Sequence, residues 1–377
     1  FFFGYLRMAL IQPFRALRPQ AQLASLVASL PYDVLNAAEA KLAATGNPNS
    51  FLHITKSEID LPENLDSYSP EVYETAKTNL SAFISRDVLF RENKPCLYIY
   101  RLTMNGVSQT GLVALSSIQD YEQDIIRKHE FTRPEKEQDR IRHIAVTGAQ
   151  TGNVFLAYRQ QPGIDELIHQ WTTTKNPVYD FIASDDIQHT IWIINDDKVM
   201  QAIVELFEQQ VPFTYIADGH HRAASAAKVR NTLTGTIPSG ADYFLTTLFP
   251  SNQLRILDYN RVVKDLNGHT PESFLTALAA DYQIESAGAE MVRPRHPHEM
   301  GMYLANQWYR LHSLPGTYST DPIGVLDVSI LQQNILSKWL GIQDVRTDKR
   351  IDFVGGIRGL GELEKRVNSG EMAVAFS

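Results

Sequence analysis

One short stretch places several chemically active side chains at the junction of a predicted strand and a predicted helix. It reads YIADGHHRAASAAK over residues 215–228. The apolar run ends at Asp218, Gly219 lets the backbone come close to a ligand, and the alanine-rich part favours a helix. The first turn of that helix has free N–H groups and the positive end of the helix dipole, which suits an anion. Arg222 adds a guanidinium fork suited to phosphate oxygens. The predicted phosphate- or nucleotide-binding residues here are Gly219, His220, His221 and Arg222.

Two other interpretations of this stretch stay open. Adjacent histidines such as His220 and His221 lie about 100° apart on a helix, which disfavours one metal ion shared by both. The usual spacing of helical metal ligands is i, i+4. A polar strand-to-helix cap with surface histidines is the alternative that involves no ligand.

A second charged stretch, IIRKHEFTRPEKEQDRIRH, covers residues 125–143. Thr132 and Glu135 have the spacing of a capping box, and Pro134 suits the first turn of a helix, which predicts a helix that starts near Arg133.

The side chains of this predicted helix are sorted by charge. Lys136, Arg140 and His143 fall at i, i+4 and i+7, on one cationic face, while Glu137 is rotated away. Such a face could hold the outer phosphates of a nucleotide; the alternative is an ordinary solvated face. The predicted phosphate-binding residues are Arg133, Lys136 and Arg140. The candidates for proton transfer just upstream are His129 and Glu130.

A third stretch, KRIDFVGGIRGLGELEKRV over residues 349–367, repeats the order of strand, glycines, arginine and helix. It matches neither the dinucleotide-binding nor the Walker A glycine pattern. Gly355, Gly356 and Arg358 are predicted to contribute to phosphate binding, and a tight turn is the alternative.

Two N-terminal segments could hold a substrate. Asp33 follows a proline-fixed turn, where a carboxylate can act as a general base or a Mg²⁺ ligand, although most such residues only form the turn. A later segment, NPNSFLHI, carries polar side chains able to bind a small substrate or to form an Asx-rich loop. Its candidate substrate-binding residues are Asn49, Ser50 and His53.

The elements that must position these residues alternate unevenly between strands and helices, which predicts an α/β or α+β protein with mixed sheets. We expect a strand over residues 9–16, a loop entering a strand over 47–55 and a helix capped by Ser69 with Pro70 at its first position. Asn105-Gly106 predicts a hairpin. Residues 1–7 are interpreted as an extension before Met8, residues 8–265 as the core and residues 266–377 as a C-terminal α/β subdomain.

Composition excludes several classes of protein. The 377 residues carry a formal net charge of −8, which argues against general nucleic-acid binding. No apolar run is long enough to span a membrane, and one cysteine, Cys96, provides neither a disulfide nor a cysteine-built metal site. A cytoplasmic location is therefore expected. The sequence leaves homo-oligomerisation open.

Six short motifs occur along the chain in the same order as in a known protein family. PYDV, NPxSFLH, KHExTRPEKExDR, IADGHHRAASA, LDYNRVVKDLNG and RIDFVGGIRGLGELE together resemble a widespread prokaryotic family of uncharacterised proteins. That family is often labelled "SpoOJ/ParA/ParB/RepB family" and often encoded beside serine-biosynthesis genes. The D-G-x-H-R order from Asp218 to Arg222 is also distantly similar to the phosphate-binding box of the ParB/sulfiredoxin superfamily, which includes free-serine kinases.

This resemblance implies a ParB/sulfiredoxin-like core and a Mg²⁺-dependent kinase that phosphorylates the hydroxyl of free serine or a similar hydroxy acid. The implied donor is ATP, ADP or pyrophosphate, and Asp218 would help to hold Mg²⁺. An acidic residue on an earlier segment takes the hydroxyl proton in the serine kinases; Asp33 matches it in order and setting, and Glu130 is the alternative. A phosphatase, a binding protein for a phosphorylated metabolite and a ParB-like nucleotide switch are the competing functions.

Overall fold

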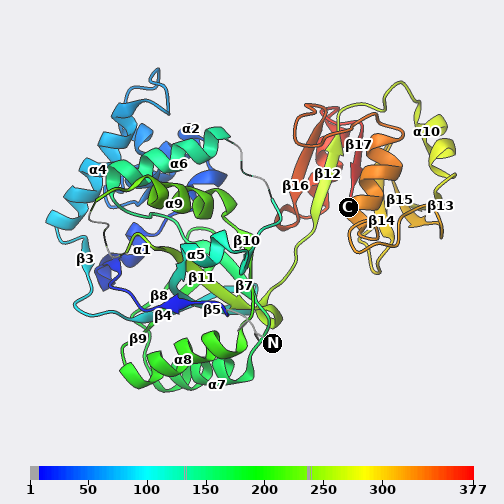
Figure 1. The fold of residues 1–377 in the computed structure, drawn as a ribbon. Helices are drawn as coiled ribbons and strands as arrows, with labels where there is room; N and C mark the ends of the chain where they lie inside the picture. The colour runs from blue at the N-terminus through cyan, green and yellow to red at the C-terminus, as the bar shows by residue number, and fades with distance from the viewer. Residues whose placement is uncertain (1–7, 131, 133, 236–237, 239) are drawn as a thin grey trace. The chain divides into compact units, whose positions relative to one another are not determined.

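The computed structural model describes residues 8–377 apart from 131, 133, 236–237 and 239 (Figure 1). The extension expected at residues 1–7 lies outside the described residues. The chain forms two compact units that divide between Leu254 and Arg255. This division falls earlier than the boundary expected near residue 265, because strand β12 (Tyr259–Val263) pairs with strands of the second unit. Both units combine helices with sheets, which confirms the predicted mixed α/β class.

A mixed sheet forms the centre of the first unit. Its strands within the described residues are β1 (Ile11–Gln12), β4 (Leu97–Met104), β5 (Val107–Ser117), β6 (Ile126–Arg127), β7 (Val154–Tyr158), β8 (Tyr179–Ile182), β9 (Gln188–Ile194), β10 (Thr214–Asp218) and β11 (Tyr243–Pro250). They lie in the order β6-β10-β7-β11-β5-β4-β9-β8, with β1 beside β5. The pairs β10–β6 and β11–β7 are parallel, and the other neighbours are antiparallel.

Two elements predicted from short sequence motifs are present in the structure. Asn105 and Gly106 take φ values of 52° and 74° between β4 and β5, as a tight hairpin turn requires. Ser69 precedes helix α4 (Pro70–Ser85), with Pro70 at its first position. Both predictions are confirmed.

Helices cover both faces of the large sheet (Figure 1). Helices α7 (Pro162–Thr174) and α8 (Asp197–Gln210) lie on one face, and α5 (Ile118–Glu122) and α9 (His220–Thr232) lie on the other. Helix α6 (Pro134–Thr147) packs on α9, and α4 packs on α6. The core between these layers is aliphatic and aromatic, and includes Ile99, Leu112, Leu156, Ile203, Phe207 and Phe244.

Short elements near the N-terminus pack beside α4. They are β2 (Leu17–Pro19), which pairs with β3 (Leu89–Arg91), the helices α1 (Ala24–Val27), α2 (Ala37–Ala44) and α3 (Leu52–Thr55), and the 3₁₀ turns η1 (Ala21–Leu23), η2 (Tyr32–Val34) and η3 (Ser57–Asp60).

Two strand predictions were wrong in this region. The segment at 47–55 ends in helix α3 because local backbone bonds, such as Thr55 N–H to Phe51 O at 3.1 Å, turn it into a helix that buries Leu52 and Ile54. The strand expected over residues 9–16 is limited to Ile11–Gln12 and one bridge residue beyond it. Pro13 has no N–H for a continuous ladder.

The second unit contains an antiparallel sheet in the order β13-β15-β14-β17-β12-β16 over the described residues. The strands other than β12 are β13 (Tyr282–Gly288), β14 (Glu299–Leu304), β15 (Gln307–Ser313), β16 (Ile351–Gly355) and β17 (Val374–Phe376). The helical segments are α10 (Pro271–Leu278), α11 (Asp327–Leu331), the π-helix η5 (Gln332–Ser337), the 3₁₀ turn η6 (Gly356–Arg358) and α12 (Gly361–Asn368). Buried side chains form a cluster around Phe274 and Phe376 and another around Trp308 and Leu363.

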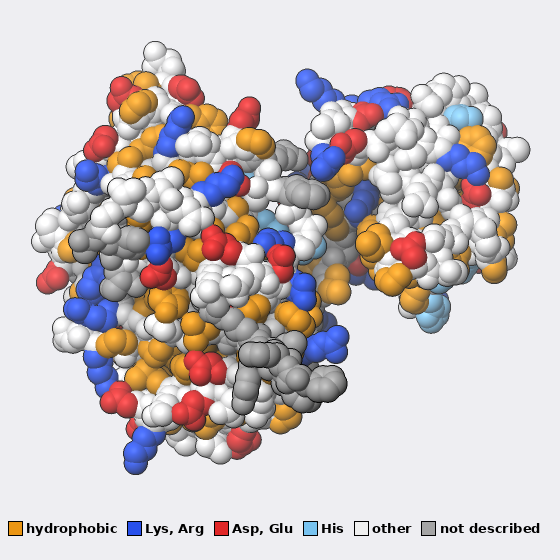
Figure 2. Space-filling view, viewed as in Figure 1, with side chains coloured by type: hydrophobic (Ala, Val, Ile, Leu, Met, Phe, Trp, Pro, Cys, Tyr) orange, Lys and Arg blue, Asp and Glu red, His pale blue; other side chains and the backbone are white. Residues whose placement is uncertain are grey.

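Acidic and basic side chains are interspersed on the face of each unit drawn in Figure 2. In the part of the chain that the structure describes, every helix is too short or too polar to cross a bilayer.

Candidate functional site

The strand-to-helix corner predicted from the sequence is present between β10 and α9. Strand β10 ends at Asp218, and Gly219 has a φ of 94°, which reverses the chain direction into a helix that starts at His220. Small buried residues let α9 approach the sheet and α6 closely; they are Ala223, Ala224, Ser225, Ala226 and Ala227. The corner is therefore held against the core, while the carboxylate of Asp218 stays 66% exposed.

Arg222, in the first turn of α9, joins three segments of the chain. Its Nη1 donates to the backbone oxygen of Asn153 at 2.6 Å, and its Nη2 contacts the carboxylate of Asp218. The same Nη2 lies 3.8 Å from Oδ2 of Asp33. The guanidinium is thus only 15% exposed, and two carboxylates from distant parts of the sequence converge on one of its nitrogens.

Two glycines make room for this arginine. A Cβ at Gly219 would lie 2.9 Å from Nε of Arg222, and a Cβ at Gly152 would lie 3.2 Å from its Cδ. A side chain at Gly219 would also be strained by the positive φ. Both glycines therefore help to determine where the guanidinium lies.

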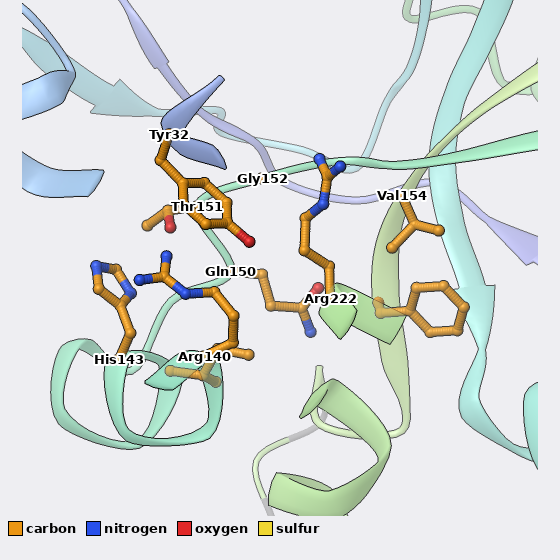
Figure 3. Close-up of a pocket in the computed structure, with 10 residues that line it drawn as sticks. Tyr32, Arg140, His143, Gln150, Thr151, Gly152, Val154 and Arg222 are labelled. Atoms are coloured by element: carbon orange, nitrogen blue, oxygen red, sulfur yellow. The ribbon is translucent and has the colours of Figure 1, made fainter. Parts of the chain in front are cut away.

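A second arginine, Arg140 on α6, lines the same small cavity as Arg222 (Figure 3). Arg140 donates to Oδ2 of Asp139 at 2.9 Å, and its Cζ lies 4.1 Å from the centre of the Tyr32 ring. Asp139 also accepts a 2.9 Å hydrogen bond from the hydroxyl of Tyr73. Burial, more than any other effect, raises the pKa of Tyr32 above its ordinary value, so this phenol stays neutral and can donate a hydrogen bond.

A small cavity lies between these two arginines. In Figure 3 the Tyr32 ring and the arginines come from three different elements. The lining residues are Tyr32, Arg140, His143, Ile144, Gln150, Thr151, Gly152, Val154, Arg222 and Phe244. The enclosed volume is about 20 Å³, enough for one water molecule. A larger anion would therefore have to bind outside this cavity, and of the lining residues Arg222 is the one that contacts Asp218 and lies near Asp33.

His143 forms the buried side of the cavity. Its Nε2 lies 3.0 Å from the backbone oxygen of Ile54, which ties α6 to helix α3. Burial, aided by the positive charge of Arg140, lowers the pKa of His143 to about 4. The imidazole is therefore neutral at physiological pH and donates its Nε2 proton to that oxygen.

A histidine pair lies on another side of the α9 N-terminus. The rings of His129 and His220 meet edge to face at 4.5 Å, and the backbone N–H of His129 points to Nε2 of His220 at 3.5 Å. Glu130 Oε2 is 3.6 Å from Nδ1 of His220. Burial and then the neighbouring His129 lower the pKa of His220, so this side chain favours its neutral form. The structure thus brings together the two charged stretches at residues 125–143 and 215–228.

The cationic face predicted for α6 is divided between surface and interior. Lys136 is exposed, whereas Arg140 and His143 are buried. Glu137, expected to point away from the functional face, is also buried; it accepts from the hydroxyl of Thr132 at 2.6 Å and contacts Lys228. The Thr132 hydroxyl thus bonds to Glu137, and the capping box expected with Glu135 stays a prediction. Arg133 lies outside the described residues.

The predicted substrate residues serve local structure around α3. His53 lies 2.8 Å from Oδ1 of Asp60 and 3.2 Å from the backbone oxygen of Asn47. Ser50 is buried and its Oγ accepts from the N–H of Leu52 at 3.4 Å, while the N–H of Asn49 donates to Oδ1 of Asn47 at 3.1 Å. None of these three candidates lines the cavity between the arginines.

The glycine-rich candidates belong to the second unit. Gly356 packs against a neighbouring chain segment, because a Cβ there would lie 2.7 Å from the backbone of Asp258, to which its N–H donates. Gly355 ends β16, and Arg358 is exposed at the end of η6. Close backbone packing thus accounts for Gly356 without a ligand.

Several cavity residues were missed by the sequence predictions. Gln150, Thr151 and Gly152 come from the loop between α6 and β7, and Gln150 is fixed by bonds to Tyr243 O at 2.9 Å and from Leu245 N at 2.7 Å. The available signal was the polar, glycine-containing run TGAQTGN between a helix and a strand. Such a run is typical of any loop, so it did not indicate a site.

His221 lies close enough to Glu137 for its charge to help lower the pKa of that carboxyl, after the stronger effects of burial, which raises it, and of Lys228 and Thr132. Among the described residues, no cluster of three or more His, Cys, Asp or Glu side chains has the arrangement of a metal site. The histidines of the corner therefore have no third ligand of those types within the described part of the chain.

Comparison with known proteins gives a family and no relative of known activity. Searches of curated proteins and of solved structures found no match to the chain. One family model matches residues 11–329, which covers nearly all of the first unit and the part of the second unit as far as Ser329. On that match, the chain belongs to the family described as "Protein of unknown function (DUF1015)".

Proposed function

We propose that this protein is a small-molecule phosphotransferase, a kinase that transfers a phosphoryl group to the hydroxyl of free serine or a similar hydroxy acid. The observation that carries the proposal is the corner at Gly219. A helix N-terminus, the guanidinium of Arg222 and the carboxylates of Asp33 and Asp218 meet there, and Arg222 also lines the small cavity that Arg140 lines. Phosphoryl transfer needs these three kinds of group: N–H donors, a cation and a carboxylate.

The charge balance at the corner favours a phosphate that arrives with a metal ion. Asp33 and Asp218 bring two negative charges to the one positive charge of Arg222. A bare phosphate would be repelled by that excess of negative charge, whereas a phosphate with bound Mg²⁺ would be attracted. Mg²⁺ usually takes one or two carboxylates and completes its shell with water and phosphate oxygens, and Asp218 would provide one carboxylate while Asp33 stays free to act as the base. When bound, the ion would neutralise charge on the donor phosphates.

The roles of the chain's own groups follow from their positions. The N–H groups of the first turn of α9 and the guanidinium of Arg222 would hold the donor phosphates. The substrate hydroxyl would attack the terminal phosphorus, its proton would pass to Asp33, and the bond from that phosphorus to the bridging oxygen would break. ATP, ADP or pyrophosphate as donor would leave as ADP, AMP or phosphate. Asp33 is preferred to Glu130 as the base because it shares Arg222 with Asp218, while Glu130 faces His220.

A ParB/sulfiredoxin-like core and a cytoplasmic location are parts of the same proposal. The support for the core is the D-G-x-H-R order at a junction between a strand and a helix. The support for the location is the single cysteine of the sequence. Arg140 is buried beside a cavity too small for a phosphoryl group, so it would act on the transferring group only through its positive charge, and exposed Lys136 would meet only the outer part of the donor.

The test is direct formation of product. The purified protein would be incubated with Mg²⁺, L-serine and each of the three donors, and O-phosphoserine would be measured by mass spectrometry. Asp33→Asn should lower turnover by about 100-fold or more while the donor still binds, because it removes the base. Asp186→Asn is the matched control: Asp186 is exposed in the turn between β8 and β9, with a φ of 61° that asparagine tolerates.

Other experimental outcomes would favour a different function over the proposed kinase activity. Release of phosphate from O-phosphoserine without a donor would identify a phosphatase, and binding of O-phosphoserine without turnover would identify a binding protein. Tight, salt-sensitive binding of DNA would favour a ParB-like switch.

A further inference from the structure

A second cavity lies within the second unit, and none of its lining residues has a role in the proposed function. It is a groove of about 290 Å³, near the lower end of the range for small-molecule sites. Its lining residues are Arg261, Val328, Ser329, Gln332, Gln333, Leu336 and Val345. They come from strand β12, helix α11, the π-helix η5 and the segment before β16. A groove of this size can accept a small metabolite.

The only charged side chain among those lining residues is that of Arg261. Its guanidinium lies over two aromatic rings, with Cζ 5.4 Å from the centre of Tyr259 and 5.6 Å from that of Phe353. The two rings stack on each other at 5.1 Å, and the guanidinium also donates to the backbone oxygen of Tyr259. These contacts hold the cation in one place, which lowers the entropy lost when a ligand binds.

Arg261 lacks the carboxylate partner that comparable arginines of the unit have. Arg310 pairs with Glu299, Arg350 with Asp348 and Arg366 with Asp352. No such ion pair involves Arg261 within the described residues, and the polar group that acts on it is Tyr259. Burial lowers the pKa of Arg261 from its ordinary value, although the group remains charged at neutral pH. A half-buried cation without a counter-charge favours an anionic ligand.

The other lining residues indicate the chemical character of the rest of the ligand. Val328, Leu336 and Val345 form an apolar part of the groove. Ser329 and two glutamines add polar groups, and Nε2 of Gln332 is held by Ser337 Oγ at 2.8 Å and Ile342 O at 2.9 Å. The π-helix that carries Gln332 is a rare distortion that occurs frequently at functional sites.

We propose that this groove binds a small aliphatic carboxylate, with its carboxylate on Arg261 and its hydrocarbon part against Val328, Leu336 and Val345. One cation matches the single charge of a carboxylate, while a phosphate dianion would call for more. This site does not depend on the proposed phosphotransferase activity, and either can fail without the other.

The test is calorimetric titration of the full-length protein with three probes. Isovalerate should bind, whereas isovaleramide, which has the same shape without the charge, and inorganic phosphate should bind at least about tenfold more weakly. Arg261→Gln should weaken isovalerate binding by about tenfold or more. Arg295→Gln is the matched control, because Arg295 is an exposed arginine of the same unit outside the groove, and it should leave the affinity unchanged.

A second variant covers the case in which Arg261→Gln disturbs the aromatic stack. Ser329→Leu fills the groove from α11, whereas Tyr259 and Phe353 belong to β12 and β16, and it should also abolish isovalerate binding while thermal unfolding stays that of the parent protein. The proposal is overturned if isovalerate fails to bind at about 10 mM. Equal binding of acid and amide, preference for phosphate, or full affinity in both folded variants would overturn it too.

Discussion

Arg222 contacts Asp218, Asp33 and the backbone of Asn153 at the same time. In this arrangement its positive charge is shared between two carboxylates, so the corner as a whole is negative near neutral pH. An anionic ligand must therefore either displace a carboxylate or bring a cation. The proposed Mg²⁺–phosphate ligand does the second, and this makes Asp33 and Asp218 useful rather than repulsive.

His143 makes the stability of the folded protein depend on pH. Its pKa is about 4 in the folded protein and about 6.5 in an unfolded chain, so the unfolded state binds more protons between these values. Stability therefore falls as the pH drops from about 6.5 towards 4. Between pH 7 and pH 5 this one group should remove about 2 kcal/mol from the free energy of unfolding.

Urea unfolding of the parent protein and of His143→Gln at the two pH values measures this contribution. The glutamine variant should lose about 2 kcal/mol less than the parent on acidification, whatever its stability at pH 7. An identical loss in both proteins would show that His143 does not titrate as its burial implies.

At the scale of elements, the corner depends on how closely α9 packs. Its alanines let the helix lie against β7, β11 and α6, and Gly219 sets the direction in which the helix leaves β10. Ser225 Oγ donates to the backbone oxygen of Glu137 at 3.1 Å, so α6 and α9 are also joined by hydrogen bonds. The two arginines of the cavity are thus carried by two helices fixed to each other.

Gly219→Ala tests this geometry. The added Cβ combines a strained positive φ with a contact to Arg222, so the variant should lose more than about 1 kcal/mol of stability and bind phosphate ligands more weakly. Gly148→Ala is the control, because Gly148 has a φ of 65° and nothing within 4 Å of an added Cβ. Gly148→Ala should therefore lose only the stability that the backbone strain costs, and it should bind phosphate ligands as the parent does. Unchanged donor affinity in Gly219→Ala would argue against a role for this turn in binding.

Local signals predicted elements well and predicted contacts poorly. The Asn105-Gly106 turn and the start of α4 at Pro70 depend on neighbouring residues only, so the sequence was sufficient. The apolar residues Leu52 and Ile54 suggested a strand because a short apolar run does not distinguish a strand from a buried helix.

The candidate site was predicted only in part, because local motifs are visible in the sequence and long-range contacts are not. The strand-to-helix corner at Gly219 depends on neighbouring residues, and its position was expected. The contact of Arg140 with Tyr32 and the space that Gly152 leaves for Arg222 join residues far apart in the chain. Helical spacing put Glu137 off the functional face, and the structure buries it because Lys228 of α9 reaches it there.

At the scale of the whole molecule, the chain combines two units with separate cores. Residues 254–258 between them form neither helix nor strand, and Ile256 is fully exposed. Limited trypsin digestion should therefore cut first after Arg255 and leave two stable fragments, as mass spectrometry would measure. Arg255→Gln should delay the cut. Simultaneous degradation of both units from the start would contradict their independence.

The most direct test of the proposed function is the affinity of Arg222→Ala for donor phosphates. Titration calorimetry with ATP, ADP and pyrophosphate, each with Mg²⁺, would compare it with the parent and with Arg230→Ala, which removes another arginine of α9, paired with Asp242. The account predicts that Arg222→Ala lowers the affinity for the donor by about two orders of magnitude while Arg230→Ala leaves it unchanged. A folded Arg222→Ala protein that binds the donor as tightly as the parent would contradict the account.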